Sequence, residues 1–175
     1  LVLTEGSTDQ DYIKTAIELL GYTELANNID VEWIGSTRNG QEFFTGDKSL
    51  NNAAEFLRAN PKLIQNRHTL LLYDFDSNKP KSVEGNLWIS SVEKNPQNQK
   101  IKKGIENLFP EHLFDLNDQR FYIKKEKIGD YGECSSVVEF KKRAFCDYLC
   151  KDRCNPLDFE HFRLLLDHLQ DFSKN

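Results

Sequence analysis

The amino-acid sequence predicts an α/β fold, in which helices flank a mainly parallel β-sheet of four to five strands. Three observations support this class. Short apolar runs of strand length recur along the 175-residue chain. Segments with apolar residues at helical spacing separate them, and strands that alternate with helices are typical of parallel sheets. Gly, Asn and Pro residues that favour turns stand between the segments.

The first half of the chain supplies three strands and two helices. The first helix is expected to begin with a capping box formed by Thr8 and Asp11, and Gly21 ends it. The apolar run 69–73 predicts a strand buried on both faces. In chain order, the sequence predicts strands at 1–4, 31–35 and 69–73, helices at 8–20 and 50–57, and turns at 39–40 and 46–47.

The second half predicts further strands and a helical end. Pro110 stops one helix, and Asn155 with Pro156 forms the cap and first turn of the last one. The two final helices have no strand between them and predict a C-terminal helical hairpin. We therefore expect a core at 1–135 and a helical extension at 136–175. The expected elements are strands at 86–91 and 121–124 and helices at 101–108, 137–150 and 157–169.

Composition indicates a cytoplasmic protein. No apolar run approaches the ~20 residues that span a bilayer, and no signal peptide opens the chain. The sequence contains no Met and begins directly inside an apparent strand. We therefore expect a piece of a longer chain that is preceded by an ATPase or another domain.

A basic segment stands out from the overall net charge of −5. Residues 79–103 contain six lysines against two glutamates, a net charge of +4. Such a segment could hold a phosphate backbone, and a solvated loop and helix face is an equally good interpretation. The lysines assigned to nucleic-acid binding are Lys79, Lys81, Lys102 and Lys103.

Two acidic motifs follow predicted strands. Glu5 ends the first strand, and Asp9 lies in the first turn of the next helix. Asp74 and Asp76 follow the strand at 69–73, and residues two apart in an extended chain point to the same side. Ligands of open α/β sheets bind at such strand ends. Four carboxylates that converge there predict a site for Mg²⁺ or Mn²⁺, since no His or Cys is nearby.

At these residues the chain resembles the Toprim domain, a catalytic fold shared by topoisomerases, bacterial primases and several nucleases. The resemblance rests on Glu5-Gly6 after the first strand and Asp74-Phe75-Asp76 after a later one, and it covers residues 1–110. The run 4–9, with its extra Asp9, looks most like nucleases of the OLD family. This resemblance implies a Toprim/Rossmann-like fold. It also implies an antiphage-defence or repair nuclease that works with an ABC-type ATPase.

The resemblance also implies later site residues. Glu106 looks like a further metal ligand, with an exposed helix face as the alternative. Lys142 is the candidate for the catalytic lysine that faces the phosphate, with a solvated basic turn as the alternative. Glu5 could also act as a general base, the role it has in topoisomerase-type Toprim domains.

The resemblance implies a metal-dependent endonuclease. Two ions ~3.5–4 Å apart would stabilise the attacking and leaving oxygens of an in-line displacement. DNA is favoured over RNA as the substrate, and a homo-oligomer remains open. The alternatives are another Toprim enzyme (a primase or an RNA-processing nuclease) and a non-catalytic module that binds nucleic acid or a partner protein.

Overall fold

A five-stranded sheet forms the centre of the computed structural model, which describes residues 1–128 and 134–174. The strand order is β2-β1-β5-β7-β6. The first four strands in this order are parallel, and β6 joins the edge antiparallel to β7. The α/β class and the mainly parallel sheet are thus confirmed. The strands are β1 (Val2–Thr4), β2 (Val31–Trp33), β5 (Thr69–Tyr73), β6 (Ser82–Glu84) and β7 (Leu87–Ser91).

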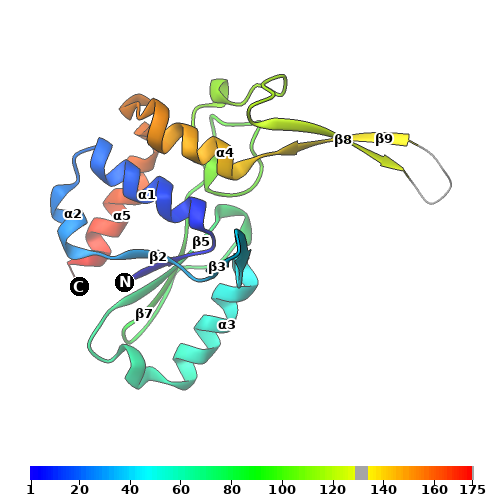
Figure 1. Cartoon of the computed structure of the whole chain (residues 1–175). Helices are drawn as coiled ribbons and strands as arrows, with labels where there is room; N and C mark the ends of the chain where they lie inside the picture. Colours follow the sequence, from blue (N-terminus) through cyan, green and yellow to red (C-terminus); the bar gives the residue numbers. More distant parts are fainter. Residues whose placement is uncertain (129–133, 175) are drawn as a thin grey trace.

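Helices cover both faces of this sheet (Figure 1). One face carries α1 (Ser7–Leu19), α2 (Thr23–Asn28) and the C-terminal α5 (Arg163–Ser173), and the other carries α3 (Gly46–Ala59). Strand β5 is buried throughout because it contacts both layers. Its Leu70 and Leu72 belong to the large core under α1, whereas Leu71 and Tyr73 pack with α3.

Phe109 joins the C-terminal helices to the large core. Its ring makes edge contacts with Tyr12 of α1, Phe145 of α4 (Lys142–Asp147) and Phe159, with centroids 4.8–5.9 Å apart. The expected boundary at 135/136 lies inside a strand, β9 (Cys134–Phe140). The remaining helical segments are η5 (Tyr148–Arg153), which is a π-helical turn, and the 3₁₀ segments η1 (Pro61–Ile64), η2 (Phe75–Ser77), η3 (Ile105–Leu108), η4 (Glu111–Leu113) and η6 (Pro156–Phe162).

The helix expected at 101–108 is wrong. Only the 3₁₀ turn η3 forms, and Gly104 precedes it with a φ of 79°. The amide of Asn107 donates to the carbonyl oxygens of Asn98 and Ile101, at 3.1 and 2.8 Å. Side-chain amides that bond backbone groups in this way compete with a helical ladder.

The helix expected at 137–150 begins too early. Residues 134–140 form β9, which pairs antiparallel with β8 (Tyr122–Ile128), and α4 starts only at Lys142. The strand expected at 121–124 is therefore part of a separate hairpin that extends away from the main body (Figure 1). The β-branched pair Val137-Val138 suits a strand better than a helix.

A second small hairpin lies near the start of α3. Its strands are β3 (Ser36–Arg38) and β4 (Gln41–Phe43), and the predicted turn at Asn39-Gly40 connects them with positive φ at both residues. The turn expected at Gly46-Asp47 is instead the first turn of α3, because Thr45 is the N-cap.

Candidate active site

The two acidic motifs meet at one edge of the sheet. Strands β1 and β5 are parallel neighbours, so their carboxyl ends lie side by side. Glu5 follows β1, and its Oε1 accepts a hydrogen bond of 3.0 Å from the backbone N–H of Asp74. Residues 69 positions apart are thereby brought into contact.

Asp9 joins this edge from the first turn of α1. Its Oδ2 accepts a hydrogen bond of 2.8 Å from the N–H of Gly6, which is the N-cap. The expected capping box of Thr8 and Asp11 is wrong, because the helix begins one residue earlier, at Ser7, and the Asp9 side chain is the one that bonds the backbone of the N-cap. The Asp9 side chain is buried. Burial, together with the charge of Glu106, raises the pKa of Asp9 to about 7.

Among the carboxyls of Glu5, Asp9 and Asp74, that of Asp74 has the highest pKa. Burial is the largest cause, and the charges of Asp9 and Glu5 add to it, so that its pKa rises to about 9. Burial also raises the pKa of Glu5. These carboxyls therefore destabilise one another's charged forms, which is the electrostatic condition that a bound cation would relieve.

Asp76 points to a different partner from Asp74. The chain does not stay extended after β5, because Phe75–Ser77 forms the 3₁₀ turn η2. The expectation that both aspartates follow one extended segment is therefore wrong. The Oδ1 of Asp76 instead accepts a hydrogen bond of 3.0 Å from the N–H of Gly104.

Glu106 and Lys142 come from distant segments and form an ion pair beside the acidic edge. Glu106 Oε2 lies 3.0 Å from Lys142 Nζ, and the Glu106 side chain is only 1% exposed. Within residues 1–128 and 134–174, its Oε1 is buried without a hydrogen-bond partner. A buried carboxylate oxygen without a partner is costly, so this atom is a candidate ligand atom. We call Glu5, Asp9, Asp74 and Glu106 the acidic cluster.

Gly104 lies against the candidate site, and the sequence analysis does not single it out. A Cβ built there would lie 2.4 Å from Glu106 Oε2 and 2.9 Å from Lys142 Nζ. The same residue donates its N–H to Asp76 and has a positive φ. Its signal in the sequence is a glycine inside a segment with apolar helical spacing, which is unfavourable for a helix.

Replacing Gly104 with Ala should therefore damage the site and the fold together. The left-handed conformation alone costs a residue with a Cβ about 1–2 kcal/mol. The added methyl group would also separate Glu106 from Lys142. We expect a lower melting temperature and weaker Mn²⁺ binding, as measured by thermal unfolding and calorimetry. Gly40→Ala, at a positive φ in the β3–β4 turn with open space around it, is the control for strain without a clash. Mn²⁺ binding that Gly104→Ala leaves unchanged would contradict this role.

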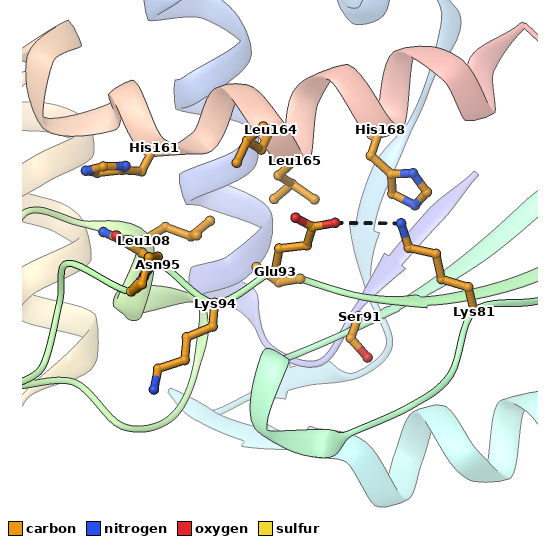
Figure 2. A pocket seen from close by; sticks show the side chains of 12 residues that line it. Lys81, Ser91, Glu93, Lys94, Asn95, Leu108, His161, Leu164, Leu165 and His168 are labelled. Carbon is orange, nitrogen blue, oxygen red and sulfur yellow. Dashed lines mark ion pairs between the residues drawn. The ribbon is translucent and has the colours of Figure 1, made fainter.

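The lysines assigned to nucleic acid are spread over several surfaces. Lys79 lies over the Tyr73 ring at 5.4 Å, whereas Lys102 and Lys103 are exposed just before Gly104. Lys81 is paired with Glu93 at 3.8 Å, and Figure 2 shows this pair at the rim of a cavity. Lys102 and Lys103 thus stand next to Gly104 in the sequence, whereas Lys81 lies on another surface.

That cavity is separate from the acidic cluster. Its volume is about 70 Å³, and none of the four cluster residues lines it. His161, Leu164, Leu165 and His168 line it from the C-terminal helices (Figure 2). The buried Nδ2 of Asn95 and Nε2 of His168 have no hydrogen-bond partner within the described residues.

The donor set of the cluster fits a hard divalent cation. All of its ligand atoms are carboxylate oxygens, which suit Mg²⁺ or Mn²⁺. In the described part of the chain, however, no three His, Cys, Asp or Glu side chains converge closely enough to hold one ion. Three of the four cluster carboxyls are hydrogen-bonded, each to its own donor: the N–H of Asp74, the N–H of Gly6 or the ammonium of Lys142.

No family model, curated protein or solved structure matches the chain. None of the helices that the structure describes combines the length and apolar character needed to cross a membrane.

Proposed function

We propose that this chain is a nuclease that hydrolyses phosphodiester bonds of DNA with the help of Mg²⁺ or Mn²⁺. The observation that carries the proposal is the contact between Glu5 and Asp74, which places the acidic ends of two parallel strands together. Asp9 and Glu106 add buried carboxyls to the same place. The likeness of the Glu5-Gly6 and Asp74-x-Asp76 motifs to Toprim nucleases supports it, and so does the sheet-edge position.

The cluster residues have distinct roles in this proposal. Glu5, Asp9, Asp74 and the unpartnered Oε1 of Glu106 would hold the metal, and Asp76 would support them through Gly104. When bound, the divalent cation would supply Lewis-acid stabilisation of the phosphate and a nucleophile at neutral pH. The half-exposed ammonium of Lys142 would neutralise charge that develops on the phosphate. The adjacent charge of Glu106 raises the pKa of Lys142, so the ammonium stays charged.

Plasmid DNA nicking tests the proposal. The purified chain should nick supercoiled plasmid in Mg²⁺ or Mn²⁺ and not in EDTA. Matched RNA and DNA oligonucleotides distinguish the substrates, since cleavage of RNA alone would favour an RNA-processing nuclease. Ribonucleotide incorporation on a single-stranded template would favour a primase instead.

We also propose that the chain is located in the cytoplasm and that its partner is an ABC-type ATPase. Addition of such a partner should stimulate nicking.

Lys142→Gln should reduce nicking by about 10²–10³-fold, the usual loss when one preorganised charge-stabilising donor is removed. Metal affinity should change much less, because Lys142 is not a ligand. Lys151→Gln is the control, since Lys151 is an exposed lysine in η5 that pairs with Asp147. Rate measurements at saturating Mn²⁺ separate the two effects. Equal nicking rates for the two variants would contradict the role of Lys142.

A further inference from the structure

Two exposed aromatic residues stand at the end of the β3–β4 hairpin. The Phe43 side chain is 42% exposed and that of Phe44 is 70% exposed. Phenylalanine rings dominate interface energetics when they are covered, so a pair of exposed ones needs an explanation.

The hairpin runs beside the acidic cluster. The N–H of Gly46, two residues after Phe44, donates to the carbonyl oxygen of Glu5 at 2.9 Å. The Ser7 hydroxyl, at the start of α1, donates to the Glu42 carboxylate. Backbone and side-chain bonds thus fix residues 42–46 along the strand end that carries Glu5.

Phe44 is held in an unfavourable backbone conformation. Its φ is 59°, which is rare for a bulky residue. Tight packing fixes the hairpin behind it, because a Cβ at Gly35 would lie 2.2 Å from the Trp33 ring and 2.3 Å from the Phe43 carbonyl oxygen. The exposed ring of Phe44 therefore stands on a rigid support.

Two cations flank the aromatic pair in the sequence. Arg38 ends β3 and Lys48 lies in the first turn of α3, and both are exposed. Among the residues that the structure describes, neither forms an ion pair with a carboxylate. An exposed aromatic ring with exposed cations near it in the sequence matches the chemistry of a single-stranded nucleic acid, whose bases stack and whose phosphates carry charge.

We propose that Phe44 is a stacking platform for an unpaired nucleobase, and that Arg38 and Lys48 hold phosphates on either side of it. The inference rests on the proposed function, which makes DNA the substrate of the acidic cluster. It adds that the DNA strand next to the cluster is unpaired. A protein partner that covers Phe44 is the competing occupant.

Fluorescence anisotropy with a labelled single-stranded DNA 12-mer, in Ca²⁺ instead of Mg²⁺, tests this platform. Phe44→Ala should weaken binding by about 5- to 150-fold, the loss expected for one stacked base. Phe44→Trp should retain binding. The control is Phe56→Ala, which removes another exposed aromatic residue from α3, and it should bind like the unmodified chain.

The salt dependence separates stacking from charge. Arg38→Gln and Lys48→Gln should each lower the slope of log K against log salt by about 0.7, whereas Phe44→Ala should leave the slope unchanged. Equal affinities of Phe44→Ala and Phe56→Ala, tighter binding of fully paired duplex than of single strand, or no binding by the unmodified chain would each overturn the inference. A dimer in sedimentation that Phe44→Ala dissolves would overturn it in favour of a protein occupant.

The nicking assay is read separately. Nicking that persists while Phe44→Ala and Phe56→Ala bind equally well leaves the proposed function intact and removes the platform. Binding that depends on Phe44 without any nicking leaves the platform intact and contradicts the proposed nuclease function.

Discussion

Replacement of Asp74 with Asn is expected to lower Mg²⁺-dependent nicking by roughly 10³-fold or more. Asp74 interacts electrostatically with Asp9, Glu5 and Glu106, so it lies at the centre of the acidic cluster. Its backbone N–H also holds the Glu5 carboxylate, and asparagine keeps that bond. The substitution therefore removes one charge of the proposed metal site without removing the scaffold.

The control for this change is Asp152→Asn, which alters an exposed carboxyl in η5. Initial nicking rates over a range of Mn²⁺ concentrations should separate weaker metal binding from slower chemistry. A variant at Asp74 that nicks at the rate of Asp152→Asn would contradict the assignment of the cluster as the active site.

The second large effect concerns stability and pH. The pKa values of Asp9 and Asp74 rise from near 3.8 to about 7 and about 9 in the folded chain. Between about pH 4 and pH 9, the folded chain therefore binds more protons than the unfolded chain. As far as these groups are concerned, the free energy of unfolding should therefore be greatest below about pH 4 and fall as the pH rises from there towards 9.

Urea unfolding at pH 5, 7 and 9 in EDTA measures this dependence. Asp74→Asn should flatten it and make the chain more stable than the unmodified protein at pH 9. Mn²⁺ should restore the stability of the unmodified chain at high pH, because a ligand that binds only the folded state stabilises it. A stability that rises from pH 7 to pH 9 in EDTA, or that Asp74→Asn leaves unchanged, would contradict the raised pKa values of Asp9 and Asp74.

The sequence was sufficient to place the two acidic motifs. Glu5 and Asp74 follow apolar strands, and parallel strand ends meet at one edge, so their contact follows from pattern alone. Only the likeness to the Toprim domain predicts roles for Glu106 and Lys142. Their contact spans 36 residues and depends on how α4 docks, which no local pattern encodes.

The errors have local physical causes. Apolar spacing at 101–108 fits a helix, but the Asn107 amide and the positive φ of Gly104 end any ladder there. The spacing at 137–150 mixes a strand and a helix, and only the pairing with β8 separates them. Phe44 shows no sequence signal because its exposure and its left-handed backbone are products of the surrounding hairpin.

Calorimetric titration with Mn²⁺ at pH 7.5, in two buffers with different ionisation enthalpies, is the most direct test of the proposed metal site at the acidic cluster. We expect saturable binding that releases protons, because Asp74, whose pKa is about 9, must lose its proton to become a ligand. We also expect the binding to disappear in Asp74→Asn and in Glu5→Gln while persisting in Asp152→Asn. Binding that survives both cluster substitutions, or no heat of binding at millimolar Mn²⁺, would contradict a metal centre at this edge of the sheet.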